Sequence, residues 1–165
     1  MSAHDPGFTI LIVDDDEGHI ELVRRNLRRI ALGNPIVALQ DGARALNYIF
    51  QRGEFIGRPP ADILMLLDIN MPGSVNGIEV LRQIKADPIT RRIPVIMLST
   101  TDDPREVSRC YDLGCSVYIT KPVDSGHFIE SVRRLGLFLQ VIQVGADDSD
   151  RFFPSNPRVP APEPR

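Results

Sequence analysis

Five short apolar runs, rich in branched residues, recur along the chain, and each is followed by a turn and a longer amphipathic segment. The runs are Thr9–Val13, Ile36–Leu39, Ile63–Leu67, Val95–Leu98 and Val117–Ile119. Because nearly every position in them is apolar, we expect strands that are buried on both faces. Strands that alternate with helices predict an α/β fold with a doubly wound, five-stranded parallel sheet and helices on both faces.

The helical segments carry start signals. Asp41 stands before Gly42–Phe50 and Asp103 stands before Pro104, so each acid is placed to cap the first turn of a helix. The first helix, predicted over Glu17–Ile30, has four apolar residues at spacings of three and four, which define one amphipathic face. They are Ile20, Val23, Leu27 and Ile30.

Two segments depart from this rhythm of strands and helices. Gln51–Ala61 contains two glycines and two prolines and is predicted to be a long loop before the third strand. The end of the chain has prolines at positions 154, 157, 160, 162 and 164 and few residues suited to a core. The sequence therefore predicts one domain over residues 8–146 and a proline-rich, disordered tail over residues 147–165.

The charge balance narrows the range of partners. The 165 residues include 19 basic and 22 acidic side chains, a formal net charge of −3, so we expect no nucleic-acid binding. Met1–Phe8 lacks a signal-peptide pattern, no apolar run is long enough to span a membrane, and no membrane association is expected. Cys110 and Cys115 are expected to be buried thiols in a reducing compartment. These features predict a cytoplasmic protein.

Chemically capable side chains gather where the predicted strands end. Asp14 and Asp15 follow the first strand and Asp68 the third. Ser99 and Lys121 follow the fourth and the fifth. The carboxyl ends of parallel strands share one edge of a sheet, where ligands bind in open α/β folds. Each acid taken singly is more often a helix cap or a turn residue, but the combination at one edge favours a functional site.

Three crowded carboxylates favour a bound cation, because they raise one another's pKa unless a positive charge compensates them. Mg²⁺ fits, since it prefers oxygen ligands, and Asp14 and Asp15 are its candidate ligands. Asp68 is a candidate nucleophile toward phosphorus that forms an aspartyl phosphate. Lys121 and Ser99 can then bind phosphoryl oxygens. A purely structural Asp–Lys ion pair is the alternative, at a cost in desolvation.

Four motifs in a fixed order carry a family resemblance. They are Ile10–Asp16, Leu66–Gly73 with Asn76-Gly77, Ile93–Ser99 and Tyr118–Pro122. As an ordered set, within about residues 8 to 135, they resemble the receiver domain of bacterial response regulators. The resemblance implies a flavodoxin-like strand order 2-1-3-4-5 and transfer of a phosphoryl group from a sensor histidine kinase to Asp68.

The resemblance also implies a ligand set for Mg²⁺. By analogy with the family, Asp14, Asp15 and Asp68 hold the ion together with the backbone carbonyl of Asn70. Lys121 corresponds to the lysine that contacts the phosphoryl group.

A switch pair follows from the same resemblance. Ser99 corresponds to the switch hydroxyl, and Tyr118 to the aromatic residue that turns inward when that hydroxyl moves toward phosphate. Asn70 and Thr101 occupy the positions that influence the lifetime of the phosphate. The peptide bond before Pro122 is expected to be cis.

Two features differ from the commonest receiver pattern. Gln51–Ala61 is longer, and Gly73–Gly77 carries one extra residue after the predicted phosphorylation site. Both features resemble the small response regulators that partner phytochrome-like histidine kinases, which implies a kinase of that type as the partner.

We expect output by protein–protein interaction, because only about 30 residues follow the receiver motifs. If Ser125–Val144 forms one helix, one apolar face is suited to packing on the sheet or on a neighbour, and a second lies opposite. The first face is Phe128, Val132, Leu135, Leu139 and Ile142, and the second is Leu137, Val141 and Val144. The second face predicts a homodimer through this helix, although Leu137–Val144 could instead be a strand that pairs with a partner's edge.

Other functions use the same residues. A phosphorelay intermediate or a phosphate sink would carry the same acceptor site without an output of its own. A Mg²⁺-dependent phosphatase with an aspartate nucleophile typically has a second acid two residues later, and here that position is Asn70. The chain is therefore expected to be a signalling phosphoacceptor and not an enzyme. His4, His19 and His127 match no phosphoacceptor motif and are expected at the surface or in caps.

Overall fold

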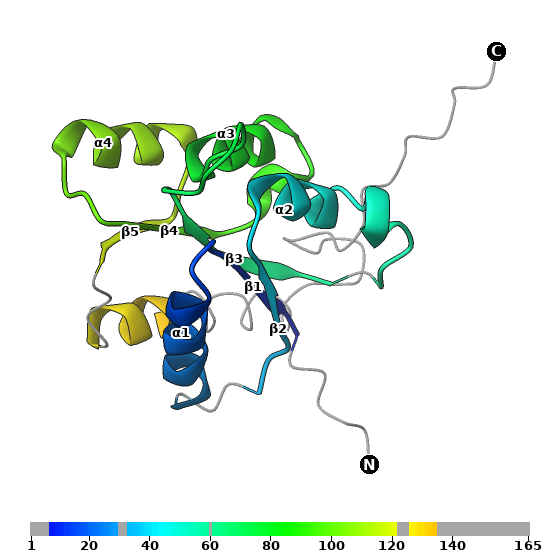
Figure 1. The fold of residues 1–165 in the computed structure, drawn as a ribbon, viewed down its shortest axis with the longest axis horizontal. Helices are drawn as coiled ribbons and strands as arrows, with labels where there is room; N and C mark the ends of the chain where they lie inside the picture. Colours follow the sequence, from blue (N-terminus) through cyan, green and yellow to red (C-terminus); the bar gives the residue numbers. More distant parts are fainter. Residues whose placement is uncertain (1–6, 30–32, 60, 122–125, 135–165) are drawn as a thin grey trace.

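The computed structural model describes residues 7–29, 33–59, 61–121 and 126–134 (Figure 1). Five parallel strands form one sheet in the order β2-β1-β3-β4-β5. The strands are β1 (Thr9–Val13), β2 (Ile36–Leu39), β3 (Ile63–Asp68), β4 (Val95–Ser99) and β5 (Val117–Thr120). The predicted strands and their flavodoxin-like order are confirmed, and the last three strands extend one residue further than expected.

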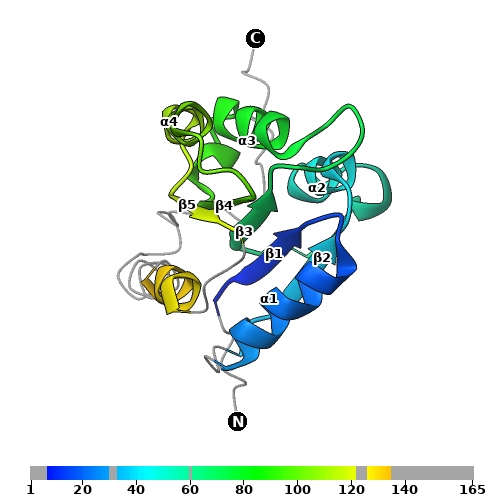
Figure 2. The ribbon, with the colours of Figure 1, turned by 60° about the vertical axis from the view of Figure 1, so that its left-hand side comes forward.

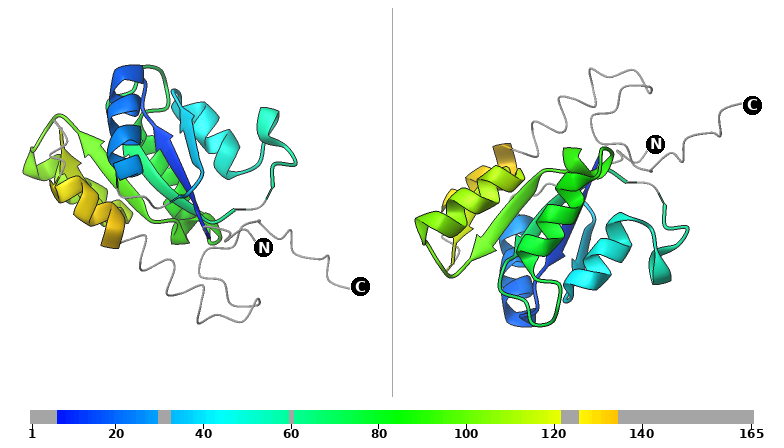
Figure 3. Two further views of the ribbon diagram at one scale, coloured as in Figure 1. Left: turned by 90° about the horizontal axis from the view of Figure 1, so that it is seen from below. Right: turned by 90° about the horizontal axis from the view of Figure 1, so that it is seen from above.

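Helices cover both faces of the sheet. They are α1 (Glu17–Arg29), α2 (Gly42–Ile49), α3 (Gly77–Ala86) and α4 (Pro104–Leu113), and residues 126–134 are also helical. In Figures 1 and 2, α2, α3 and α4 lie on one face, and α1 and the 126–134 helix lie on the other. Figure 3 shows these two layers from below and from above. Phe128 and Val132 are fully buried in the core beneath the sheet, as predicted.

The strand order reverses between β1 and β3. From β1 the sheet continues outward to β2, whereas β3, β4 and β5 follow one another in the other direction. Ile12 pairs with Leu66 across this point, and every residue of β1 and β3 is buried. A crevice forms at such a reversal in open α/β sheets. Asp14 and Asp68, at the carboxyl ends of β1 and β3, therefore come together there.

Side-chain caps fix where the helices begin. Asp41 and Asp103 each accept a backbone N–H in the first turn of α2 and α4, at 3.0 and 2.9 Å, as predicted. Asn76 does the same for α3 at 3.0 Å, a cap that the sequence analysis did not assign. α4 ends at Gly114, whose φ of 107° lies in the left-handed region that favours glycine.

Gln51–Ala61 is more ordered than the predicted loop. It contains a short 3₁₀ helix, η1 (Gly53–Phe55), that packs against α2. The rings of Tyr48 and Phe55 lie 5.1 Å apart in an edge-to-face arrangement. Arg58 Nε donates to the Tyr48 carbonyl at 2.7 Å. Gly53 and Gly57 have positive φ values of 58° and 78°, and the contacts of Phe55 and Arg58 hold the described part of the segment on the domain.

Several predictions concern residues outside the described ranges. They are the cis peptide before Pro122, the dimer face of Leu137, Val141 and Val144, and the proline-rich tail over 147–165. Among the residues that are described, no helix combines the length and the apolarity needed to cross a membrane.

Candidate functional site

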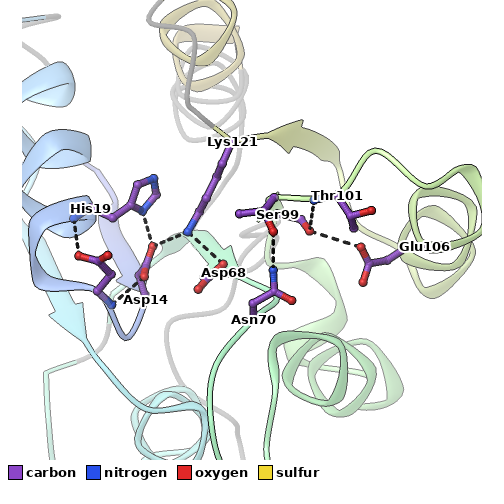
Figure 4. A network of polar contacts seen from close by, with 10 residues as sticks. Asp14, His19, Asp68, Asn70, Ser99, Thr101, Glu106 and Lys121 are labelled. Atoms are coloured by element: carbon purple, nitrogen blue, oxygen red, sulfur yellow. Dashed lines mark hydrogen bonds and ion pairs between the residues drawn. The ribbon is translucent and has the colours of Figure 1, made fainter.

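Four strands end at one crevice, and each delivers a polar side chain to it (Figure 4). Asp14 follows β1, Asp68 ends β3, Ser99 ends β4 and Lys121 follows β5. Asp14, Asp68 and Ser99 are almost fully buried, whereas Asp15 is exposed. One carboxylate oxygen from each of the three aspartates lies within 4.8 Å of the other two. The structure therefore brings the predicted side chains together.

Lys121 joins the two buried carboxylates. Its Nζ lies 3.2 Å from Asp14 Oδ2 and 3.1 Å from Asp68 Oδ1. Its backbone N–H donates to the Ser99 carbonyl at 2.6 Å, which ties the residue after β5 to the end of β4. One ammonium thus compensates two buried acids, an arrangement in which desolvation offsets much of the attraction.

Asp14 is held in its ionised form. Burial alone would raise the pKa of Asp14, but contacts with His19, the Asp16 backbone N–H and Lys121 outweigh burial and lower it. The Asp16 N–H donates to Asp14 Oδ1 at 2.9 Å, and His19 Nδ1 contacts Asp14 Oδ2. The Asp14 carboxylate therefore has a fixed orientation at the edge of the crevice.

His19 corrects an expectation from the sequence. Its side chain is only 13% exposed and turns toward Asp14, so it is neither a surface residue nor merely part of a cap. Its backbone N–H donates to Asp16 Oδ1 at 3.1 Å, so Asp16 caps the first turn of α1. The position of His19 in the first turn of α1, just after the acidic run, could have indicated this contact. The spacing of apolar residues, from which the helix was predicted, contains no information about polar residues.

The pKa of Asp68 is shifted in the opposite direction, upward. Burial, together with the negative charge of Asp14, raises the pKa of Asp68, and Lys121 and the Asn70 backbone N–H only partly offset this. Gly77, at the start of α3, fixes the strand end, since a Cβ there would lie 2.2 Å from the Asp68 carbonyl oxygen. Asp68 is therefore a rigidly placed carboxylate whose charge the protein compensates incompletely.

The donor set fits a divalent cation. Asp14, Asp15 and Asp68 offer carboxylate oxygens at a spacing that one ion can bridge. Hard divalent cations prefer such oxygen ligands. Because burial and the charge of Asp14 raise the pKa of Asp68, additional positive charge nearby would favour its ionised form. The acidic cluster thus has oxygen ligands of the right type and a negative charge that a metal ion would compensate.

Ser99 and Tyr118 meet at a residue that the sequence analysis did not single out. Ser99 Oγ donates to Glu106 Oε2 at 3.3 Å. The Tyr118 hydroxyl lies 2.8 Å from the Thr101 carbonyl oxygen and 3.1 Å from the same Glu106 oxygen. Burial, with a contribution from Glu106, raises the pKa of Tyr118 to about 12. Tyr118 is therefore turned inward, toward the loop after β4, and is only 8% exposed.

Asn70 and Thr101 flank the crevice differently. Asn70 is exposed, and its Nδ2 donates to Thr100 Oγ1 at 3.2 Å. Thr101 contacts both predicted switch residues through its backbone, because its N–H donates to Ser99 Oγ at 3.2 Å and its carbonyl accepts from Tyr118, while its Oγ1 accepts the Asp103 N–H at 3.1 Å. The first residue faces the opening of the site, and the second links the two predicted switch residues.

The fold and this site agree with a known family. The response regulator receiver domain family matches residues 10–133, three quarters of the chain. The chain belongs to this family. The receiver crevice is thus the group of residues at the carboxyl ends of β1, β3, β4 and β5, where the sequence placed it.

Similar receivers have been solved or curated. A response regulator receiver domain from Rhodospirillum rubrum is 48% identical, with 82% of this chain and 95% of that chain covered and a TM-score of 0.66. Response regulator Rcp1 of Synechocystis sp. (strain PCC 6803) is 35% identical over 71% of this chain and 78% of its own length. A solved structure of the Mn²⁺-bound form of response regulator Rcp1 is 32% identical, with 79% of this chain and 93% of that chain covered and a TM-score of 0.68. The phosphorylated cyanobacterial phytochrome response regulator RcpA is 34% identical, covers 79% and 92%, and has a TM-score of 0.68.

Proposed function

We propose that this response regulator accepts a phosphoryl group on Asp68 from a histidine kinase and signals through protein–protein contacts, not through enzymatic turnover. The observation that carries the proposal is the setting of Asp68. Its buried carboxylate has a raised pKa, lies among acidic neighbours and has the Lys121 ammonium 3.1 Å from Oδ1. Such a group is placed to react with phosphorus once positive charge surrounds it.

The transfer itself exchanges one bond for another. A carboxylate oxygen of Asp68 attacks phosphorus, the P–N bond of the kinase phosphohistidine breaks, and the released imidazole nitrogen takes a proton. Lys121 stays beside the product, where its ammonium pairs with the phosphoryl oxygens. Water later hydrolyses the acyl phosphate, and Asn70 and Thr101, on either side of the opening, modulate its access.

Mg²⁺ is the metal that we assign to the acidic cluster. Asp14, Asp15, Asp68 and the backbone carbonyl of Asn70 would hold it, and the bound ion would neutralise charge on the phosphoryl group. The similarity to Rcp1, which has been solved with Mn²⁺, supports a divalent ion at these residues. Asp14 is already ionised and oriented, so little rearrangement of this ligand is needed.

Ser99 and Tyr118 form the proposed switch. In this role the Ser99 hydroxyl donates to a phosphoryl oxygen on Asp68, and the inward position of Tyr118 is stabilised as a consequence. A phosphoryl group shifts the equilibrium only because it binds one arrangement of Ser99 and Lys121 better than the other.

The proposed partner is a phytochrome-type histidine kinase. The similarity to RcpA and Rcp1 supports it, as does the long segment Gln51–Ala61. The two free, buried thiols, Cys110 and Cys115, suit the cytoplasm, where we place the interaction. The homodimer through Leu137, Val141 and Val144 stays a prediction, and light scattering on a variant with Leu137→Glu and Val141→Glu tests it.

Intact-mass spectrometry after incubation with Mg²⁺ and acetyl phosphate tests the function. We expect one labile phosphoryl adduct on the wild type, none on Asp68→Asn, and a normal adduct on Asp112→Asn, which replaces an exposed aspartate of α4. Chelation of the divalent ion should abolish the reaction. An adduct that persists in Asp68→Asn, or its complete absence from the wild type, would overturn the proposal.

A further inference from the structure

One carboxylate oxygen connects the two switch residues. Glu106 lies in the first turn of α4 and is half-buried. Its Oε2 accepts from Ser99 Oγ at 3.3 Å and lies 3.1 Å from the hydroxyl of Tyr118. Figure 4 shows Glu106 reaching toward Ser99 from the side opposite Lys121. Glu106 therefore stands between the crevice and the β5 edge of the sheet.

The one donor proton of the Ser99 hydroxyl is already used in this arrangement. A serine hydroxyl has one proton to donate, and here that proton goes to Glu106. Its oxygen meanwhile accepts the N–H of Thr101 at 3.2 Å. A phosphoryl oxygen on Asp68 would need the same proton. The phosphoryl group and the Glu106 carboxylate consequently compete for one hydrogen bond.

Two acceptors also compete for the proton of the Tyr118 hydroxyl. Its single proton is shared between the Thr101 carbonyl at 2.8 Å and Glu106 Oε2 at 3.1 Å. While Ser99 also donates to Oε2, the Glu106 charge is divided between two hydroxyls. When Ser99 turns away, that charge is left to Tyr118 alone. A change at Ser99 is thus transmitted to Tyr118 through Glu106 Oε2, in addition to the direct contact between the two hydroxyl groups.

Resting on the proposed function, we propose that Glu106 is a positioning residue that couples the phosphorylation site to Tyr118. In the unphosphorylated protein it holds the Ser99 hydroxyl away from Asp68 and so restrains phosphorylation. After phosphorylation it releases Ser99 and strengthens the inward position of Tyr118.

A helix-stabilising role alone would not require these contacts. Asp103 already caps α4 by accepting the Arg105 N–H at 2.9 Å. Glu79 provides a matched control, since it also lies in the first turn of its helix, α3, but pairs on the surface with Arg82. A general effect of removing a first-turn acid should appear equally in Glu79→Ala.

The test measures the rate of phosphorylation by acetyl phosphate with Mg²⁺, followed by intact mass. We expect Glu106→Ala to react about fivefold faster than the wild type, the factor for a hydrogen bond of about 1 kcal/mol. Glu106→Gln keeps an acceptor oxygen without the charge and should fall between the two. Glu79→Ala should react at the wild-type rate. In a Ser99→Ala background the effect of Glu106→Ala should vanish, because no hydroxyl is left to release.

The second readout follows Tyr118 itself. With ¹³C-labelled tyrosine and Tyr118→Phe for assignment, phosphorylation of the wild type should shift the Tyr118 ring signals in NMR spectra. In Glu106→Ala this shift should be reduced although phosphorylation is complete. The signals of Tyr48, which lies on α2, serve as the internal reference.

Each outcome bears on a different claim. Equal rates in wild type and Glu106→Ala, or a rate difference that survives in the Ser99→Ala background, would overturn the coupling role of Glu106. A wild type that takes up no phosphoryl group would contradict the proposed function instead. If Glu106→Ala does not fold by circular dichroism, the isosteric Glu106→Gln decides the matter by the same comparison.

Discussion

Asp14 and Asp68 end neighbouring strands, and the protein shifts their pKa values in opposite directions. Both carboxylates are buried, and both contact Lys121. The pKa of Asp14 falls because His19 and the Asp16 N–H add to Lys121 and together outweigh burial. The pKa of Asp68 rises because burial and the charge of Asp14 exceed what Lys121 offsets. Asp14 is thus held ionised in a fixed orientation, whereas the negative charge of Asp68 is only partly compensated.

Replacing Asp68 with Asn is expected to stabilise the unphosphorylated protein. Because its pKa is raised in the fold, ionised Asp68 is less favourable there than in the unfolded chain. This penalty is fully present above the raised pKa and vanishes as the pH falls below the ordinary carboxyl value. At neutral pH, Asp68→Asn should raise the free energy of unfolding by on the order of 1 kcal/mol, measured by urea unfolding.

Asp14→Asn is the matched control, with the opposite sign. The lowered pKa of Asp14 stabilises the fold above the ordinary carboxyl value, and this stabilisation is lost as the pH falls through the lowered pKa. The variant should therefore be less stable than the wild type at neutral pH. Shifts of the same sign in Asp14→Asn and Asp68→Asn would contradict the charge distribution described here.

Mg²⁺ should raise the melting temperature, because a ligand that binds only the folded state stabilises it. Asp15→Asn is the most informative variant, since Asp15 is exposed and its removal should leave the metal-free protein almost unchanged. The Mg²⁺-induced shift should become much smaller in this variant and stay normal in Asp112→Asn. A full shift in Asp15→Asn would place the ion elsewhere.

His19→Ala is expected to lower the free energy of unfolding by about 1–3 kcal/mol, the range for depriving a buried polar group of a hydrogen-bond partner. The reason is that Asp14 stays buried with one partner fewer. Urea unfolding of His19→Ala and His19→Asn measures the loss, and the asparagine variant, which keeps a donor, should lose less. His127→Ala, on an exposed position of the 126–134 helix, is the control, and equal losses at both positions would count against the contact.

Arg58 should anchor the segment after α2. Its guanidinium carbon lies 4.4 Å from the centre of the Tyr48 ring, and its Nε donates to the Tyr48 carbonyl at 2.7 Å. Arg58→Ala should cost about 1–2 kcal/mol and speed hydrogen exchange over η1. Arg52→Ala, an exposed arginine 4.9 Å from the Phe50 ring centre, should change little. Unchanged exchange in Arg58→Ala would show that other contacts order the segment.

The sequence predicted the strands and their burial on both faces, because buried parallel strands are apolar at almost every position. Ile63–Asp68 illustrates this, since five apolar residues precede the one acid that the strand delivers to the crevice. The rule that parallel strands end at one edge then placed Asp14, Asp68, Ser99 and Lys121 together. This part of the site depends only on where the strands end, and the pattern of apolar residues predicts those positions well.

The contacts from helices were harder to predict. His19 and Glu106 reach the site from the first turns of α1 and α4, where polar residues also serve as caps or solvated positions. Their direction depends on how each helix rotates against the sheet. The order of Gln51–Ala61 likewise depends on where Arg58 and Tyr48 meet in space, which glycine and proline positions do not reveal.

Chemical trapping tests the central claim most directly. After phosphorylation with acetyl phosphate, borohydride reduction converts an aspartyl phosphate to homoserine, and peptide mass spectrometry locates the converted residue. We predict conversion at Asp68 alone, with Asp14 and Asp15 unchanged. Conversion at Asp14 or Asp15, or an adduct that resists borohydride, would contradict the assignment of Asp68 as the phosphoacceptor.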